Sequence, residues 1–217
     1  MIKAANVCKN YTDNPILKDI SLEIQAGEIV SIVGASGAGK STLLHLLGSL
    51  DKPTSGNIYI DNTDITKLND TDLSNFRNQY LGFIFQFHQL LPEFTVLENV
   101  CLPAWIAGKD KETTTKKAKE LLDYLRLSHR SQHQPAQLSG GEQQRTAVAR
   151  ALINQPKIVF ADEPSGNLDS QNAQELHQLF FQLREQFHQT FVIVTHNEVL
   201  AAASDRVITM KDGRIRG

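Results

Sequence analysis

Residues 29 to 44 read Ile29-Val30-Ser31-Ile32-Val33-Gly34-Ala35-Ser36-Gly37-Ala38-Gly39-Lys40-Ser41-Thr42-Leu43-Leu44. Within them, the pattern Gly-x-x-x-x-Gly-Lys-Ser follows a short apolar run and precedes an amphipathic one. Glycines let a loop curl until several backbone N–H groups point at one anion. A helix that begins near Lys40 turns its positive dipole end toward the same anion. The pattern therefore predicts a phosphate-binding loop, with Lys40 on the β- and γ-phosphates of a nucleotide and Ser41 as a Mg²⁺ ligand.

The bulk composition is that of an ordinary globular domain. The chain has 217 residues and a formal net charge of −2, which argues against a general polyanion-binding surface. Cys8 and Cys101 lie far apart in the sequence and in no metal-ligand spacing, so we expect free thiols in a reducing compartment. No apolar run reaches the roughly 18–20 residues that span a bilayer, and Met1-Ile2-Lys3 begins no signal peptide. We expect a soluble chain for which any membrane role requires a separate partner.

Short apolar runs alternate with helical patterns along most of the chain. Buried strands are expected at Ile29–Val33, Leu81–Phe85, Lys157–Ala161 and Phe191–Val194, and helices at Lys40–Leu50 and from Ser170 onward. This alternation is typical of a parallel sheet covered on both faces, on which ligands bind beyond the carboxyl ends of the strands. The glycine loop, Gln86, Asp162-Glu163 and His196 each follow an apolar run. We therefore expect them to converge on one edge of the sheet.

Near the N-terminus, two strand-like segments at residues 2–7 and 20–24 flank a polar loop that carries Tyr11. An exposed aromatic ring in this loop could stack on a nucleobase through its π-face. It could equally cover the edge of the sheet. The sequence leaves these two interpretations of Tyr11 open.

The stretch from about His88 to Asn154 shows helical periods and no convincing strand. Thr95 and Glu98 stand three residues apart before an apolar pattern, as in a helix N-terminal capping box. The segment Glu112–Leu125 places its apolar residues on one face and most of its charges away from it. We expect this stretch to form a helical subdomain inserted between strands.

Two carboxylates, Asp162 and Glu163, end the apolar run that begins at Ile158. Adjacent residues at a strand terminus can serve different partners. Asp162 is placed to hold Mg²⁺, directly or through water, and Glu163 is placed to polarise an attacking water as general base. Alternatively, Asp162-Glu163-Pro164 is only a strand stop, because proline cannot continue the strand.

The segment Leu138-Ser139-Gly140-Gly141-Glu142-Gln143-Gln144 opens a predicted helix that runs to Asn154. Ser139 and Glu142 have the spacing of a capping box. A cap does not explain Gly140-Gly141, because glycines lower helix propensity in the first turn. Paired glycines expose backbone N–H groups at the positive end of the helix, which suits a second phosphate-binding surface. Since the glycine loop already surrounds one nucleotide, this surface makes most sense if it serves the nucleotide of another subunit.

These motifs together resemble those of the ATP-binding-cassette (ABC) ATPases from Tyr11 to Gly213. The resemblance implies that ATP is bound by Tyr11 of the A-loop and by Gly34, Ala35, Ser36, Gly37, Ala38, Gly39, Lys40, Ser41 and Thr42 of the Walker A motif. It further implies a Q-loop at Gln86, a signature at Leu138–Gln143, a Walker B motif at Ile158–Glu163, a D-loop at Gly166–Asp169 and a switch His196. Departures are small: Ser165 stands where threonine is common, and Thr146 where an apolar residue is usual.

The resemblance also implies a fold and a mechanism. It implies an α/β P-loop NTPase in a single domain, 1–217, with a parallel-sheet RecA-like core and an N-terminal antiparallel β-subdomain in 1–87 and 155–217. A helical subdomain at about 88–154 carries the signature. Hydrolysis of ATP would use Glu163, His196 and Gln86 as catalytic residues, Mg²⁺ on Ser41, Gln86 and Asp162, and Asp169 in the D-loop. In a head-to-tail homodimer, Ser139, Gly140, Gly141 and Glu142 would contact the other subunit's ATP.

A finer resemblance lies in Phe85–Val100 and Leu43–Gly48, which are similar to segments of the ATPases of lipoprotein-releasing transporters. That group overlaps closely with macrolide-exporter ATPases. The resemblance implies a peripheral subunit on the cytoplasmic side of the inner membrane, with separate transmembrane permease subunits that handle a lipoprotein or other amphiphile. Export of a macrolide or peptide, and a non-transporting regulator of cell division, remain alternatives. A nucleic-acid partner is not expected, because the chain has neither an inserted coiled coil nor zinc cysteines.

Overall fold

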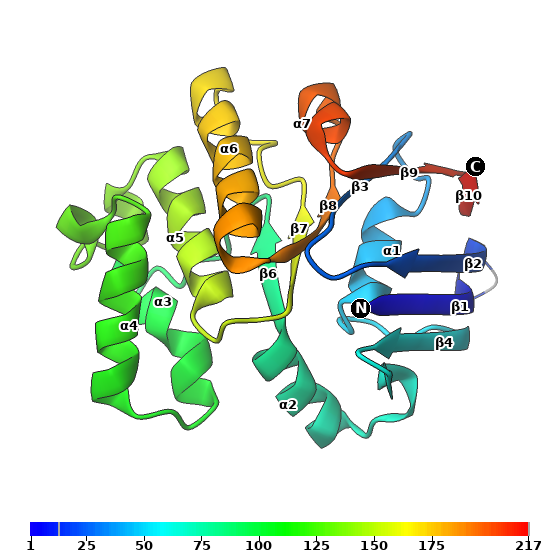
Figure 1. Cartoon of the computed structure of the whole chain (residues 1–217), viewed down its shortest axis with the longest axis horizontal. Coiled ribbons are helices and arrows are strands. Elements are labelled where there is room, and N and C mark those ends of the chain that lie inside the picture. The colour runs from blue at the N-terminus through cyan, green and yellow to red at the C-terminus, as the bar shows by residue number, and fades with distance from the viewer. Residues whose placement is uncertain (13, 217) are drawn as a thin grey trace. The chain divides into compact units, whose positions relative to one another are not determined.

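The computed structural model describes residues 1–12 and 14–216, which form two compact units (Figure 1). The first unit combines Met1–Arg77 with Leu183–Gly217, and the second is Asn78–Gln182. Helices α2 (Asp70–Tyr80) and α6 (Ser170–Phe187) each contain one of the boundaries between the two units. The expected division into a core and a helical subdomain at about 88–154 stays a prediction.

The first unit contains an antiparallel sheet in the strand order β2-β1-β4-β5. Its elements are β1 (Ile2–Tyr11), β2 (Asn14–Ile24), β4 (Ser55–Ile60) and β5 (Thr63–Asp64), followed by the short 3₁₀ helix η1 (Ile65–Lys67). Ile2 pairs with Ile24 on one side and with Ile60 on the other, and all three side chains are buried. These alternating apolar positions give the sheet one buried face.

The first unit also contains the strand that leads into the glycine loop. This strand, β3 (Ile29–Gly34), lies parallel to β8 (Thr190–Val194) and β9 (Arg206–Lys211), and β10 (Arg214–Arg216) pairs antiparallel with β9. Every residue of β8 is buried. Helix α1 (Lys40–Leu47) packs on β3 and β8, and α7 (Glu198–Ala203) packs on β3 and β9. Each leucine that α1 buries contributes on the order of 1.5–3 kcal/mol to folding.

Helix α1 ends at Leu47, so the predicted helix Lys40–Leu50 is too long. The Gly48 N–H still donates to Leu44 O at 2.8 Å, but Ser49 then adopts a left-handed conformation with φ of 58°. This turn brings Leu50 to the surface, where it is 40% exposed rather than part of the buried face. A glycine directly after the last helical residue is a common stop signal.

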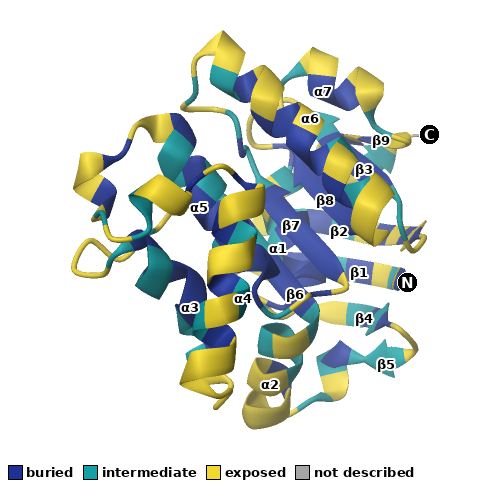
Figure 2. Ribbon diagram, turned by 60° about the vertical axis from the view of Figure 1, so that its left-hand side comes forward, coloured by how far each residue is buried: buried dark blue, intermediate teal, exposed yellow. Residues whose placement is uncertain are grey.

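The second unit places three helices beside a pair of parallel strands. The strands are β6 (Leu81–Phe85) and β7 (Ile158–Asp162), and the helices are α3 (Val96–Ile106), α4 (Lys111–Tyr124) and α5 (Gly140–Leu152), with 3₁₀ helices η2 (Ser128–Arg130) and η3 (Pro135–Gln137) before α5. Helix α3 contacts α4 and α5, and α5 packs on β6. A Cβ on Gly82 of β6 would lie 2.6 Å from Ala151 O, so glycine permits this close approach. Figure 2 shows β7 in the dark blue of buried residues.

The predicted fold class is confirmed, since an antiparallel sheet, parallel strands and packed helices are all present. The capping box predicted at Thr95 is also present: the Thr95 N–H donates to Glu98 Oε2 at 2.8 Å and Thr95 Oγ1 accepts from the Glu98 N–H at 3.2 Å. None of the described helices combines the length and the apolar content that a membrane crossing requires.

Candidate functional site

The glycine loop of the first unit joins the end of β3 to the start of α1. Gly34, Gly37 and Gly39 have φ of 149°, 78° and 97°, a region that other residues rarely enter. A Cβ on Gly34 would lie 2.2 Å from Met210 O, and one on Gly39 would lie 2.7 Å from Leu17 Cδ2. No side chain in the described part of the chain caps the start of α1. The loop therefore has the backbone conformation and the helix N-terminus that an anion cradle requires.

Lys40 is the first residue of α1, and its side chain turns back over the loop. The Lys40 ammonium donates to Gly34 O at 2.9 Å and to Ala35 O at 3.0 Å. Ser41 follows in the same first helical turn. The ammonium thus lies beside the loop backbone, where it can reach an anion that the loop N–H groups bind.

His196 leaves the same sheet edge as the glycine loop. Strands β3 and β8 are parallel, Ile32 pairs with Val194, and the Thr195 N–H donates to Ile32 O at 3.2 Å. The next residue, Asn197, caps α7 by accepting the Leu200 N–H at 2.9 Å. The buried Thr195 and this cap hold the backbone on both sides of His196. The first unit therefore brings the glycine loop and His196 together, as the strand-end placement predicts.

Tyr11 ends β1 and is 49% exposed. The Tyr11 hydroxyl donates to Asp51 Oδ2 at 2.6 Å, and the Lys9 ammonium lies 4.7 Å from the centre of the ring. The hydrogen bond to Asp51 and partial burial raise the pKa of Tyr11, so the phenol stays neutral. Asp51 also accepts from Lys9 at 2.7 Å. Tyr11 is thus anchored at its hydroxyl while about half of the residue stays exposed, and stacking of its ring on a base stays a prediction.

The second unit brings Gln86, Asp162 and Glu163 together. Phe85 of β6 pairs in register with Asp162 of β7, so Gln86 and Glu163 are the first residues beyond two adjacent strand ends. Glu163 has a φ of 46°, a left-handed conformation that costs on the order of 1 kcal/mol outside glycine. Such strain is often found where a side chain is held for function. The carboxylates and the glutamine amide therefore share one edge.

Gln86 is tied to the segment that follows Glu163. Its Nε2 donates to Asn167 Oδ1 at 3.1 Å, and Asn167 Nδ2 donates back to Gln86 O at 3.2 Å. A Cβ on Gly166 would lie 2.9 Å from Gln86 Nε2. Farther along, Asp169 accepts from the Asn172 N–H at 2.9 Å, which with the Asn172 amide lowers the pKa of Asp169. Within the chain, Asp169 is thus a helix-capping residue of α6.

The start of α5 has the predicted capping box. The Ser139 N–H donates to Glu142 Oε2 at 2.8 Å, and Ser139 Oγ accepts from the Glu142 N–H at 3.3 Å. A Cβ on Gly141 would lie 2.2 Å from Asn172 Oδ1, so packing alone requires glycine there. A Cβ on Gly140 would come no nearer than 3.7 Å to Leu168 among the described residues, which is an ordinary contact. Packing therefore explains one glycine of the pair and does not explain the other.

The Mg²⁺ ligands expected from the sequence offer hydroxyl, amide and carboxylate oxygens. Hard cations such as Mg²⁺ prefer oxygen ligands, and they commonly use one or two carboxylates with phosphates and water. Gln86 and Asp162 lie at paired strand ends of the second unit, and Ser41 lies in the first unit. The described residues contain no cluster of three or more His, Cys, Asp and Glu side chains. The oxygen donors of this set therefore fit the ligand preference of Mg²⁺.

Sequence patterns did not reveal three residues that position the site. Asp51 anchors Tyr11, Arg150 donates to His88 O and Gln89 O just after Gln86, and Arg130 donates to Glu142 Oε1 at 2.8 Å. Each acts across 12 or more positions of sequence, so no local spacing signals it. These segments were predicted to be loops or helix surfaces. The charge of the three residues is the only signal in the sequence that could have identified them.

A family model described as ABC transporter matches residues 17–166. The "Lipoprotein-releasing system ATP-binding protein LolD" of Cytophaga hutchinsonii is 61% identical over 215 residues, which cover 99% of this chain and 98% of the relative. The protein of the same name from Bacteroides fragilis is 57% identical, with 99% of this chain and 100% of the relative covered.

Solved structures are also similar to this chain over its full length. A dimeric structure of a post-hydrolysis state of the ATP-binding cassette MJ0796, bound to ADP and Pi, has a TM-score of 0.92 and 43% identity, covering 100% of this chain and 97% of that one. The structure of cbiO1 from Clostridium perfringens, part of the ABC transporter complex cbiONQ, has a TM-score of 0.90 and 30% identity, covering 100% and 86%.

Proposed function

Because this chain belongs to the ABC transporter family and is an ATPase of that family, we propose that it powers the release of lipoproteins from the inner membrane. The observation that carries this proposal is the near-full-length identity to relatives named for lipoprotein release. The chain acts as a homodimer on the cytoplasmic side of that membrane, bound to separate transmembrane subunits. Those subunits handle the lipoprotein, and this chain supplies the work of ATP binding and hydrolysis.

The first unit binds the nucleotide. Backbone N–H groups of residues 34–42 and the Lys40 ammonium contact the β- and γ-phosphates, and the exposed ring face of Tyr11 stacks on the base. Ser41, Gln86 and Asp162 would hold Mg²⁺, which when bound would supply positive charge to offset that of the phosphate oxygens. The left-handed glycines of the loop support this role, because they allow the backbone to curl around a phosphate.

Hydrolysis requires a base and a means of holding the γ-phosphate. Glu163 accepts the proton of the attacking water, and its left-handed backbone directly after β7 supports a functional role for this residue. His196 hydrogen-bonds the γ-phosphate, and Gln86 places the water. These are positioning and electrostatic tasks, which supply most of the catalysis of phosphoryl transfer.

The signature residues act on the nucleotide of a second copy. Ser139, Gly140, Gly141 and Glu142 form an N-terminal helix end that can bind an anion, and each chain already has a phosphate loop of its own. Gly140 supports this role because no contact within the described chain excludes a side chain there. The dimeric form of the similar cassette MJ0796 supports pairing of two copies.

The membrane subunit docks beside Gln86. The docking surface consists of Phe87, Leu91 and Phe94, which are 74%, 38% and 36% exposed. Exposed aromatic and leucine side chains gathered in one segment are typical of an interaction site. Arg150 and the buried Asn99 hold this segment in place by hydrogen bonds to its backbone. Because the segment begins at Gln86, movement of the partner can reach the catalytic site.

The proposal is tested by reconstitution of the complete transporter. The chain is combined with its membrane subunits in lipid vesicles that contain a lipoprotein, and ATP-dependent release is measured. We expect release with the natural chain and none with Glu163→Gln, which keeps ATP binding and reduces hydrolysis by at least about a hundredfold. Hydrolysis by Glu163→Gln near the natural rate would remove the general-base role.

Co-purification separates lipoprotein release from other uses of the same ATPase. We expect the membrane subunit recovered with the chain to support lipoprotein release in the vesicles. Recovery with a complex that gates a cell-wall hydrolase, or release of a small drug or peptide but no lipoprotein, would overturn the proposed substrate. The ATPase itself would stand in both cases.

A further inference from the structure

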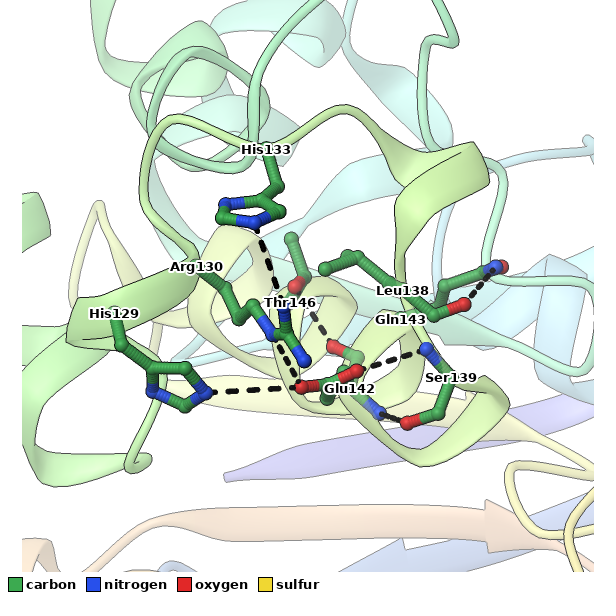
Figure 3. Close-up of polar contacts among 8 residues, drawn as sticks. All are labelled: His129, Arg130, His133, Leu138, Ser139, Glu142, Gln143 and Thr146. Atoms are coloured by element: carbon green, nitrogen blue, oxygen red, sulfur yellow. Dashed lines mark hydrogen bonds and ion pairs between the residues drawn. The ribbon is translucent and has the colours of Figure 1, made fainter.

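Figure 3 shows Arg130, His129 and His133 beside Glu142 at the start of α5. Arg130, the last residue of η2, donates from Nε to Glu142 Oε1 at 2.8 Å. Its Nη1 lies 3.3 Å from His133 Nε2, and His129 Nε2 lies 3.9 Å from Glu142 Oε1. A guanidinium can only donate, so His133 accepts this bond. The side chain of Arg130 is 34% exposed and that of Glu142 is 13% exposed, so the pair is partly shielded from water.

Glu142 divides its two carboxylate oxygens between two partners. One oxygen accepts from Arg130, and the other accepts from the Ser139 N–H at 2.8 Å. The Glu142 N–H in turn donates to the Ser139 hydroxyl at 3.3 Å. Arg130 and Ser139 each bond one oxygen of the Glu142 carboxylate, and together they fix its rotamer. The orientation of Ser139 is thus linked to Arg130. Burial alone would raise the pKa of Glu142, but the hydrogen bonds from Ser139 and Arg130 and the positive charge of Arg130 lower it to about 2. The carboxylate is therefore ionised at physiological pH.

An ionised glutamate at this place creates an electrostatic difficulty. A bare carboxylate in the first turn of α5 repels a phosphate that approaches the helix N-terminus. The positive charge of Arg130, which is hydrogen-bonded to Glu142 Oε1, offsets this repulsion. The same contact prevents the carboxylate from swinging toward water and releasing the Ser139 N–H.

We infer that Arg130 is a positioning residue for the reaction: it holds and neutralises Glu142 so that Ser139 can bind the phosphate of a second copy. The inference rests on the proposed function, in which Ser139 contacts the partner's nucleotide. Arg130 itself touches no nucleotide and acts only through Glu142. Its effect is therefore confined to ATP-driven pairing of two chains, while ATP binding by one chain, which uses the glycine loop, does not change.

The test measures ATP-driven dimerisation of full-length chains that carry Glu163→Gln, by sedimentation with MgATP. We expect Arg130→Met to weaken the dimer by about tenfold or more, since a charge-assisted hydrogen bond is lost. Arg130→Lys, which keeps the charge but not the fork of donors, should recover part of that loss. Affinity of the single chain for a fluorescent ATP analogue should stay within about twofold of the parent.

A matched control uses a second Arg–Glu pair of similar exposure. Arg206 donates from Nε to Glu28 Oε1 at 2.7 Å in the first unit, with side chains 43% and 15% exposed. Arg206→Met should leave ATP-driven dimerisation unchanged. A loss equal to that of Arg130→Met would mean that removal of any such ion pair weakens the dimer, and the inference would be wrong.

A double variant separates positioning from folding. With Glu142→Gln, the side chain is neutral, its amide oxygen can still accept the Ser139 N–H, and no charge is left for Arg130 to offset. We therefore expect Arg130→Met to have no further effect in a chain that already carries Glu142→Gln. An equal loss in both backgrounds would assign Arg130 a merely structural role and overturn the inference. If the parent Glu163→Gln chain itself fails to dimerise with ATP, the part of the proposed function in which Ser139 contacts a second copy's nucleotide fails instead. This outcome differs from an equal loss in both backgrounds.

Discussion

At the scale of single residues, the two glycines at the start of α5 have different physical reasons to be glycine. Asn172, which a Cβ on Gly141 would approach to 2.2 Å, is fixed by hydrogen bonds of 2.9 and 2.6 Å to Asp169. Moving its side chain aside would break the bond of 2.6 Å from Asn172 Nδ2 to Asp169 Oδ2. Gly140 meets no such obstacle in the described chain, so packing within the chain does not require glycine there.

Alanine at these two positions should therefore affect different properties, stability at Gly141 and pairing at Gly140. We expect Gly141→Ala to lower the free energy of unfolding by about 1–3 kcal/mol through overpacking. Gly140→Ala should change it by less than about 1 kcal/mol and yet weaken ATP-driven pairing of Glu163→Gln chains. Urea unfolding and sedimentation measure the two effects. Undiminished pairing of Gly140→Ala would remove the reason given for this glycine.

Glu142 should make stability depend on pH in the acid range. Its pKa is lowered from the ordinary 4.5 to about 2, against the effect of burial, by bonds from Ser139 and Arg130. A lowered folded-state pKa gives stability that is complete above pH 4.5 and is lost as pH falls from about 4.5 to about 2. Water reaches part of this pair, so the contribution at neutral pH is on the order of 1–2 kcal/mol. The difference in unfolding free energy between the natural chain and Glu142→Gln should therefore shrink from pH 7 to pH 3; a constant difference would contradict it.

At the scale of elements, one buried asparagine organises the segment that precedes α3. Asn99 is fully buried; it accepts from the Leu91 N–H at 2.8 Å and donates to Leu91 O, Phe94 O and Thr95 O at 3.0–3.1 Å. Asn99→Ala leaves these backbone groups without that partner and should cost about 2–4 kcal/mol. We expect faster hydrogen exchange in residues 88–95 and loss of binding to the membrane subunit, with unchanged ATP binding. Unchanged exchange there would show that the docking surface does not depend on Asn99.

Sequence reasoning reached the elements that local patterns specify. The capping boxes at Thr95 and Ser139 follow from a three-residue spacing, and the parallel strands follow from short apolar runs between helices. The end of α1 was missed because the leucine pattern continues past Gly48 into Leu50, although the backbone has already turned. The partners of Tyr11, Glu142 and the Asn99 segment were missed for another reason. Those contacts depend on the path that each loop takes in the folded chain. The spacing of residues along one sequence does not reveal that path.

At the scale of the whole molecule, the placement of the two anion-binding helix ends has consequences for symmetry. Each chain carries one glycine loop in its first unit and one signature helix in its second. If the loop of one copy meets the signature of the other, a two-fold axis repeats the contact, and the dimer contains two composite sites. Each site then takes Lys40 from one copy and Ser139 from the other. A site within one chain would take both from the same copy.

Mixing two inactive variants distinguishes these arrangements. Chains with Lys40→Ala and chains with Ser139→Ala each form dimers in which every composite site lacks one group. Random pairing at equal concentrations makes about half the dimers mixed, and a mixed dimer has one intact site, so hydrolysis should recover to about a quarter of the natural rate. The assay uses chains assembled with their membrane subunits. Replacing the Ser139→Ala chain by one that carries both changes is the control, because no mixed dimer then has an intact site, and activity should stay absent. No recovery in the first mixture would show that Lys40 and Ser139 do not act across two copies, and recovery in the control would show that Lys40 is not required.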